Sequence, residues 1–503
     1  MESCHWIHAV AGRRSPRRVT TGPRLGSTQF FAPTLLSRRY RSDHVRPVAW
    51  GKADRRRRRV DFYLKPEILE RLGALGGADI VVGVPSFNNA RTIRHVVEAI
   101  EVGLQKYFPA SRAVIVNSDG GSSDGTRDAV VGARIEDRHL LLLSHGLSPV
   151  HRLVTPYQGV PGKGSAFRTI FRIAEVLGAQ ACAVVDSDLR SITPEWIDLL
   201  LRPLLHAGYD YVSSYYLRHK YDGTITNSIV YPLTRALYGQ RVRQPIGGDF
   251  GFSGRLASHY LKHDVWDTEI ARYGIDIWMT TTAICGGYQV CQSFLGAKIH
   301  DAKDPGADLS AMLTQVVGSV FRLMETYEAK WTPVQGSRDV PLFGFRYGVG
   351  LEPIQVNLDR MVSQFQTGLS GLREVWELAL RPETARELAL LGARDPQRFH
   401  LPDELWVQVI QEFAVAYHRS VINHDHLLRS LTPIYLGRVA SFVVETRESY
   451  AEQVEEKIER LCLLYEQKKP PLVERWRAAP MRKREEHVEA APAPVAAAHQ
   501  GGD

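Results

Sequence analysis

Two aspartates, Asp186 and Asp188, stand one residue apart directly after a short apolar run at 181–185. The run predicts a buried strand. Residues i and i+2 of an extended chain point the same way, so both carboxylates can face one site. Two close carboxylates repel unless a cation joins them, and a divalent metal ion bound to a diphosphate would be such a cation. A pair of loop or helix-capping carboxylates is the structural alternative, since this spacing is common by chance.

Two polar segments follow earlier predicted strands, at 80–84 and 113–116. Pro85 and Asn88 come after the first strand, where a nucleoside would lie. Asp119 comes after the second and can accept a hydrogen bond from a base or ribose, while Gly120 permits close backbone approach. A β-turn and a capped loop are the structural alternatives. Because the carboxyl ends of parallel strands meet at one sheet edge, their occurrence together favours a shared ligand site.

Lys163 lies between two glycines, just before a helix predicted at 164–178. A phosphate could meet both the lysine charge and the positive helix N-terminus there. Charge that develops on a departing diphosphate would be neutralised by Lys163 and a metal ion. A surface lysine is the alternative. Strands that alternate with helices over this part of the chain predict an α/β fold with a mainly parallel sheet.

With these motifs, the chain resembles the family 2-like glycosyltransferases of the GT-A fold, a Rossmann-like nucleotide-diphospho-sugar transferase architecture. It looks most like the retaining branch that contains mannosylglycerate synthase and glucosyl-3-phosphoglycerate synthase. The resemblance covers about 79–305. It rests on the Asp-Ser-Asp motif and on three further segments, namely Pro-Ile-Gly-Gly-Asp-Phe at 245–250, Gly-Ile-Asp-Ile-Trp at 274–278 and Lys-Ile-His-Asp at 298–301.

The resemblance implies roles for individual residues. Asp188 and His300 would bind a divalent cation, Mg²⁺ or Mn²⁺, with Asp186 in support; a surface loop is the alternative for His300. Lys163 would lie near the phosphates and Asp249 near the transferred sugar, and these two are the predicted catalytic residues. The predicted nucleotide-sugar contacts are Pro85, Asn88, Asp119, Gly120, Lys163, Asp186 and Ser187.

The same branch holds the carboxylate of its acceptor with an arginine and a threonine eight residues further on, and Arg218 and Thr226 have this spacing. A guanidinium and a hydroxyl near a helix N-terminus are suited to a carboxylate. A surface arginine and an ordinary helix N-cap are the alternative. The chain departs from the branch at Lys298, where an arginine usually stands two residues before the metal-binding histidine.

Four regions are expected along the chain. Residues 1–60 are Arg-rich without apolar periodicity and read as a disordered extension. The GT-A domain follows at 61–305. Amphipathic stretches at 309–327, 356–378, 405–417 and 435–465 predict a helical C-terminal region over 306–468, in which strands vanish. Residues 469–503 are predicted to be a disordered tail.

The composition of the chain restricts the possible classes of function and partner further. Residues 1–59 hold fourteen arginines and one lysine against three acids, an excess of +12, so the rest of the chain, with a total of +8, carries −4. The basic charge thus belongs to one segment and does not argue for nucleic acid. Five scattered cysteines indicate a reduced, cytoplasmic protein. Apolar runs are only a few residues long, so no transmembrane helix is expected.

We therefore predict a cytoplasmic, metal-dependent hexosyltransferase. It would use a nucleoside diphosphate sugar and a small hydroxy-acid acceptor, glycerate or 3-phosphoglycerate-like, with retention. Its product would be a glucosylglycerate or mannosylglycerate of the compatible-solute kind, and the helical region is a candidate homodimer surface. An inverting transferase acting on a lipid phosphate or polysaccharide is the second hypothesis, and a non-catalytic sugar-nucleotide-binding regulator is the third.

Overall fold

The computed structural model describes residues 64–133, 150–156, 162–300, 310–348, 350–351, 353–392 and 394–478. These residues belong to one compact unit, so the predicted catalytic and helical regions are not separate bodies. The predicted extension at 1–60 lies outside the described residues, as do 479–503 of the predicted tail.

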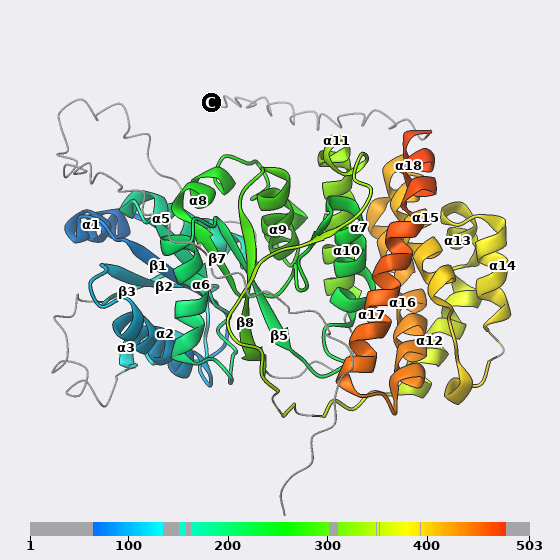
Figure 1. Ribbon diagram of the computed structural model, residues 1–503, viewed down its shortest axis with the longest axis horizontal. Coiled ribbons are helices and arrows are strands. Elements are labelled where there is room, and N and C mark those ends of the chain that lie inside the picture. Colours follow the sequence, from blue (N-terminus) through cyan, green and yellow to red (C-terminus); the bar gives the residue numbers. More distant parts are fainter. Residues whose placement is uncertain are drawn as a thin grey trace, which may run out of the picture. The chain divides into compact units, whose positions relative to one another are not determined.

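An eight-stranded sheet lies at the centre of the described fold (Figure 1). Its strands run in the order β10-β8-β5-β7-β4-β1-β2-β3. β7 is antiparallel to both of its neighbours, and every other neighbouring pair is parallel. The strands are β1 (Ile80–Ser86), β2 (Ala113–Asp119), β3 (Val150–Pro156), β4 (Ala181–Val184), β5 (Tyr211–Leu217), β7 (Phe250–Ser253), β8 (Val290–Ala297) and β10 (Leu342–Phe343). The predicted α/β class is confirmed.

Helices cover both faces of this sheet, as expected for parallel strands joined by helical connections. One face carries α5 (Lys163–Leu177), α8 (Gly254–Tyr260) and α9 (Ile275–Cys285), and the other carries α2 (Ile93–Tyr107), α3 (Thr126–Gly132) and α6 (Pro194–His206). The remaining elements of this half are α1 (Pro66–Leu75), η2 (Thr226–Val230), α7 (Tyr231–Tyr238), β6 (Gln240–Arg241) and η3 (Glu269–Ala271).

Alternation along β1 shows why this segment forms a central strand. Val81 packs into the core beneath α5, whereas Val82 and Val84 pack into the core beneath α2 and α6. At Gly83 a Cβ atom would lie 2.5 Å from the Ile170 side chain, so glycine lets α5 approach the sheet closely. The predicted strand at 80–84 is confirmed and continues through Pro85 to Ser86.

The C-terminal region is helical, with two corrections. Strands do not vanish after residue 306, since β10 extends the main sheet and β9 (Arg338–Asp339) pairs with β6. The predicted tail begins too early, because Lys469–Arg477 forms α18. The other helices are α10 (Ser310–Thr326), α11 (Glu328–Trp331), α12 (Leu358–Gly371), α13 (Arg373–Ala379), α14 (Pro382–Leu390), η4 (Pro396–Arg398), α15 (Asp403–Arg419), α16 (His424–Thr446) and α17 (Ala451–Gln467).

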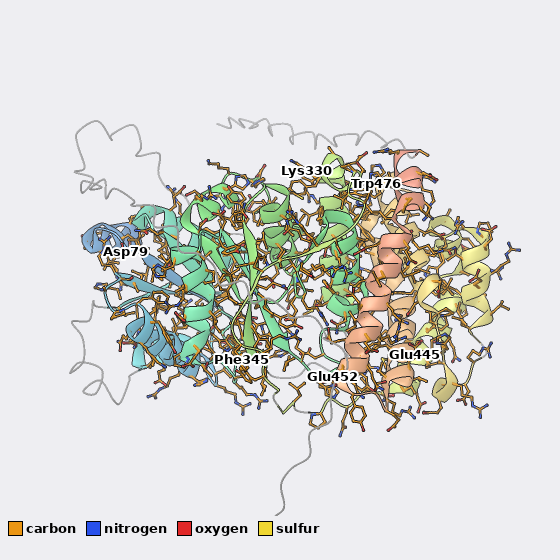
Figure 2. The ribbon with its side chains drawn as sticks, viewed as in Figure 1. Asp79, Lys330, Phe345, Glu445, Glu452 and Trp476 are labelled. Atoms are coloured by element: carbon orange, nitrogen blue, oxygen red, sulfur yellow. The ribbon has the colours of Figure 1, made fainter. Side chains whose placement is uncertain are left out.

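Buried charges join the helical region to the sheet half through α7. The fully buried Arg235 forms ion pairs with Glu459, at 2.5 Å, and Glu466, at 2.7 Å, both from α17. Figure 2 labels Lys330 of α11 and Trp476 of α18, which lie close together. The ring of Trp476 packs edge-on against Trp331, with centroids 5.4 Å apart. A buried tryptophan contact of this kind explains why α18 is ordered against the core.

One described helix, α16, is long and apolar enough to cross a membrane by length and composition alone. In its most apolar window 78% is buried inside the fold, a property that the core helix of a globular protein shares. The expectation that the chain has no transmembrane helix therefore stays a prediction.

Lys469 is the buried cation that fixes the start of α18. Its Nζ donates hydrogen bonds to the carbonyl oxygens of Ala236 at 2.9 Å, Leu237 at 3.2 Å and Val334 at 2.7 Å. The first two carbonyls belong to the last turn of α7, where the helix dipole attracts a cation. Burial lowers the pKa of Lys469 to about 8.

This pKa gives a test of the α18 contact. Because the unfolded chain holds the Lys469 proton up to about pH 10.4, it binds more protons than the native state above pH 8. The contribution of Lys469 to the free energy of unfolding is therefore expected to rise between pH 8 and pH 10, by at most about 1.4 kcal/mol per pH unit. Denaturant unfolding of the native chain and Lys469→Met at both pH values measures this difference. The exposed Lys468→Ala is the control, and a pH-independent difference for Lys469→Met would contradict the assignment.

Candidate active site

A cleft of about 710 Å³ opens along the edge of the sheet where the parallel strands end. β1, β4, β5 and β8 all finish at this edge, and the antiparallel β7 begins there, so residues far apart in sequence converge. The predicted site residues that line the cleft are Pro85, Gly120, Lys163, Asp186, Ser187, Asp188, Arg218, Thr226 and His300. Three predicted residues, Asn88, Asp119 and Asp249, do not line it.

A buried ammonium group, that of Lys298, forms the floor of the cleft. Its Nζ lies 2.8 Å from Asp186 Oδ2 and 2.7 Å from Asp249 Oδ2, and it donates to the Gly247 carbonyl oxygen at 2.8 Å. Burial alone would lower the pKa of Lys298, but the carboxylates of Asp186 and Asp249 outweigh it and raise the pKa. The lysine is thus held charged, and it fixes two carboxylates from different strands in one place.

Lys163, the first residue of α5, forms a second ion pair with the same aspartate. Its Nζ lies 2.8 Å from Asp186 Oδ1 and 3.3 Å from Asp276 of α9. Burial would lower the pKa of Lys163, yet the charges of Asp186 and Asp276 raise it. The pKa of Asp186 shifts in the opposite direction. Burial would raise it, but the charges of Lys163 and Lys298 lower it strongly. Both lysines are therefore charged at the position where a diphosphate would enter.

Gly248 allows these side chains to come together. Its φ of 93° lies in the left-handed region, and a Cβ atom there would lie 2.2 Å from Asp186 Oδ2. Any residue with a side chain would therefore both strain the backbone and displace the carboxylate. Gly248 is therefore a steric requirement of the ion-pair cluster, whereas at Gly247 a Cβ atom would lie 2.2 Å from the Ser214 hydroxyl oxygen.

Asp249 is not where the resemblance implies. It is fully buried, and its carboxylate accepts hydrogen bonds from the backbone N–H of Asp186 at 2.7 Å and from the Tyr216 hydroxyl. With Lys298 as its third partner, it lies beneath the cleft floor and supports Asp186. We correct its predicted role beside the transferred sugar to that of a positioning residue.

The predicted metal ligands separate into two groups. Asp186 has both carboxylate oxygens on lysines, so it is part of the ion-pair cluster, and its supporting part in the metal site stays a prediction. Among the described residues, Asp188 forms no hydrogen bond or ion pair, and burial together with the Asp186 charge raises its pKa. His300 lines the same cleft, and its charge acts on Asp188 to lower that pKa.

This donor set fits a divalent cation. No group of three histidine, cysteine or acidic side chains suited to a metal ion occurs in the part of the chain that the structure describes. Asp186, Asp188 and Asp276 line the cleft floor and Asp249 lies beneath it, against Lys163 and Lys298, so this cluster of four aspartates and two lysines has a formal charge of −2. A carboxylate and an imidazole, completed by phosphate and water oxygens, suit Mg²⁺ or Mn²⁺.

The predicted acceptor residues lie on the other wall. Arg218 follows β5, and Thr226 opens η2, in a helical turn that begins at residue 224. Arg218 Nη1 donates to Asp222 Oδ2 at 3.2 Å, and the same oxygen lies 3.7 Å from His300 Nε2. Burial would raise the pKa of Asp222, but Arg218 and His300 lower it. Asp222 therefore links the acceptor arginine to the predicted metal ligand.

Two predicted nucleotide contacts instead organise the loops at the other end of the cleft. Asp119 is buried and accepts hydrogen bonds from the Ser122 hydroxyl at 2.6 Å and the Arg127 guanidinium at 2.7 Å. Asn88 has a φ of 54° and accepts from the Ser123 N–H at 3.0 Å, so it joins the loops after β1 and β2. Phe87 lines the cleft at this end. Its side chain is 61% exposed and offers a flat surface for a base.

Sequence reasoning gave no role to several residues of the site. Asp222 stands in a predicted loop without a recognisable motif, and Asp276 was noticed only as part of a resembling segment. Lys298 was noted as a departure from the family pattern, and its position two residues before His300 was the one available signal. Arg272, Tyr273 and Gln315 also line the cleft, and nothing in their spacing indicates it, whereas Phe87 lies in the loop after the first strand, where the sequence predicts the nucleoside.

Comparison with known protein families gives no match, and neither does comparison with curated proteins. Among solved structures, glucosyl-3-phosphoglycerate synthase from Mycobacterium tuberculosis with Mn²⁺, UDP and glucosyl-3-phosphoglycerate is similar, at 22% identity and a TM-score of 0.38. The alignment covers 51% of this chain and 83% of that one. The same enzyme with Mn²⁺, UDP-glucose and phosphoglyceric acid aligns at 22% identity and a TM-score of 0.37, covering 52% and 84%. A further mycobacterial protein aligns at 22% identity and 0.36, covering 51% and 78%.

The first two structures are of glucosyl-3-phosphoglycerate synthase, which belongs to the branch that the sequence motifs resemble. The alignments span about half of this chain at 22% identity. The evidence for its activity is therefore the arrangement of the residues in its own cleft.

Asp222 gives the first test of that site. Asp222→Asn keeps the size of the side chain but removes the charge that Arg218 and His300 share. We expect the KM for a carboxylate acceptor to rise about tenfold, the scale of one charge-assisted hydrogen bond. Mn²⁺ binding in the presence of a nucleoside diphosphate, followed by electron paramagnetic resonance, is expected to weaken as well. The exposed Asp264→Asn is the matched control. If acceptor KM and Mn²⁺ affinity both stay unchanged, Asp222 does not link the two walls.

Proposed function

We propose that this protein is a metal-dependent glycosyltransferase that moves a hexose from a nucleoside diphosphate sugar to a small hydroxy acid, with retention. One observation carries the proposal. A cleft at the carboxyl edge of the sheet brings the buried Lys298 and the partly buried Lys163 together with Asp188, a carboxylate without a hydrogen bond or ion pair among the described residues, and the cluster of four aspartates and two lysines there has a formal charge of −2. Mg²⁺ or Mn²⁺ at Asp188 and His300 balances that charge and, when bound, would stabilise the departing diphosphate as a Lewis acid.

The chain's own residues divide the remaining tasks. Lys163 stands at the N-terminus of α5, so its ammonium group and the helix dipole act on the same phosphate. The loops after β1 and β2, with Pro85, Phe87 and Gly120 on the cleft, would hold the nucleoside. Arg218 and Thr226 would hold the acceptor carboxylate on the opposite wall. The acceptor hydroxyl then lies between the two walls, which is the arrangement that transfer requires.

The chemistry of the cleft also bears on stereochemistry. The carboxylates of Asp186 and Asp276 are bound to lysines, and Asp188 is assigned to the cation, so no carboxylate of the cleft is left in this proposal to attack as a nucleophile. A front-face reaction, in which the leaving phosphate takes the proton of the acceptor hydroxyl, uses the groups that are in place. A cytoplasmic location, a homodimer and a product of the glucosylglycerate or mannosylglycerate kind stay predictions.

A matrix of nucleotide sugars against hydroxy acids tests the proposal. UDP-, GDP- and ADP-hexoses are each combined with glycerate and 3-phosphoglycerate, with Mg²⁺ or Mn²⁺. Product mass and anomeric nuclear magnetic resonance are then recorded. We expect one donor to give a glycoside with the anomeric configuration of the donor. An inverted product would overturn the retention part, and the absence of turnover and of donor binding with every combination would overturn the function.

Asp188 supplies the matching variant. Asp188→Ala is expected to lower kcat by at least about a hundredfold, because preorganised charge at the leaving group is the largest catalytic contribution at such sites. Metal-dependent binding of the nucleoside diphosphate is expected to be lost, while the melting temperature stays close to that of the native chain. The exposed Asp267→Ala is the control. Native activity of Asp188→Ala in the presence of EDTA would exclude this residue as a metal ligand.

A further inference from the structure

A second cavity, of about 1140 Å³, lies beside the candidate active site. Its walls are formed by η3 and by one side each of α10, α12 and α16. We call it the helical cavity. Arg272 and Gln315 line both this cavity and the active-site cleft, so the two spaces adjoin. A nucleoside diphosphate hexose and a three-carbon acid would be accommodated in the 710 Å³ of the cleft, so neither of them needs the helical cavity.

Direct helix contacts hold the walls of the helical cavity in place. At Gly318 of α10 a Cβ atom would lie 2.8 Å from Leu428, and at Gly368 of α12 it would lie 2.5 Å from Pro433. Leu428 and Pro433 both belong to α16, so this helix is in close contact with α10 and α12. All four residues line the cavity. The cavity is partly open to solvent, but its walls are packed helices, so its shape is preformed, as that of ligand sites usually is.

The polar groups of the helical cavity are incompletely paired. The hydroxyl oxygens of Thr314 and Thr432 are buried and have no hydrogen-bond partner among the residues that the structure describes. A buried hydroxyl without a partner costs about 1–3 kcal/mol, so such groups need an explanation. The rest of the lining is rich in amides and hydroxyls, namely Gln315, Gln364, Thr367 and Asn423. Donors and acceptors of this mixed kind match a polyhydroxylated ligand.

The charged residues that line the helical cavity restrict the net charge of a ligand that could bind there. Arg429 is paired with Asp425 at 2.8 Å, and Arg272 lies 3.6 Å from Glu269. The partly buried Arg322 forms no ion pair or side-chain hydrogen bond with the described residues. One positive charge thus remains, which suits a ligand that is neutral or carries one acidic group.

From this geometry we infer that the helical cavity binds the glycosyl part of a longer acceptor, a glycoside that is neutral or has one acidic group. The inference rests on the proposed function, because the reacting hydroxyl of that acceptor has to reach the donor in the adjoining cleft. Arg322 would then gain a partner that it lacks among the described residues. The acceptor is accordingly a hydroxy acid that already bears sugar units.

Acceptors of increasing length test the inference on the full chain. Glycerate, glucosylglycerate and maltosylglycerate are compared as acceptors with the donor identified above. We expect kcat/KM to rise about tenfold or more from glycerate to the glycosides, the equivalent of one charged or two neutral hydrogen bonds. Equal or falling kcat/KM along the series would overturn the inference.

Two variants localise the effect. Arg322→Met removes the unpaired charge, and Thr432→Leu replaces a hydroxyl by a larger apolar group that fills part of the cavity. Each variant is expected to abolish the preference for glycosides. Their kcat/KM with glycerate and their affinity for the nucleoside diphosphate should stay within about twofold of native. Arg360→Met, an exposed arginine of α12 outside the cavity, is the control. Equal losses with short and long acceptors in both variants, or an unchanged preference, would place the glycoside elsewhere.

The two proposals fail in different ways. If no nucleotide sugar is bound or consumed, the proposed function fails, and this inference fails with it. If the donor is bound and transfer to glycerate occurs without any gain from added sugar units, only the acceptor inference is wrong.

Discussion

The pairing of Lys298 with Asp186 and Asp249 is the interaction on which the candidate site depends. A buried ammonium group is tolerated only where anionic partners surround it, and removal of one partner from such a cluster typically costs 3–5 kcal/mol. The two aspartates come from the end of β4 and the start of β7, and the lysine follows β8. Satisfaction of these charges therefore requires the three strands to align at one edge, which also closes the cleft floor.

The antiparallel strand β7 makes this arrangement possible. A parallel strand would begin at the opposite edge of the sheet, and its preceding residues would lie far from the cleft. Because β7 runs the other way, Gly248 and Asp249 enter from the cleft side. Gly248 gives room to Asp186, and Asp249 binds the backbone of the same residue. Asp188, two residues further on, is left facing the cleft without a cationic partner in the described chain, which is the condition that favours a metal ion.

The helical region takes part in the acceptor wall. Lys220, in the loop after β5, donates to the carbonyl oxygens of Thr446 at 2.7 Å and Arg447 at 2.8 Å, at the end of α16. The Thr224 hydroxyl lies 2.6 Å from that of Tyr435 in the same helix. The segment that carries Arg218, Asp222 and Thr226 is thus fixed by α16, which also lines the helical cavity. The acceptor half of the site is a joint product of the sheet and the helices.

The sequence by itself determined the α/β class, the central strands and the sheet edge at which ligands meet, because these follow from local hydrophobic patterns and the ends of apolar runs. It also indicated Lys163, Asp188, His300, Arg218 and Thr226, which line one cleft. Local patterns predict helix boundaries less well where helices pack on helices. The single amphipathic stretch predicted at 356–378 contains two helices, α12 and α13.

Tertiary structure alone decided which charge pairs with which. Asp186 and Asp188 look equivalent in the sequence, yet Asp186 binds Lys298, 112 residues away, and Asp188 does not. Asn88 and Asp119 likewise form hydrogen bonds with neighbouring loops, and Asp249 lies beneath the cleft floor. The reason is physical: backbone preferences act over a few residues, whereas the partner of a buried charge depends on which distant segments the sheet brings within hydrogen-bonding distance.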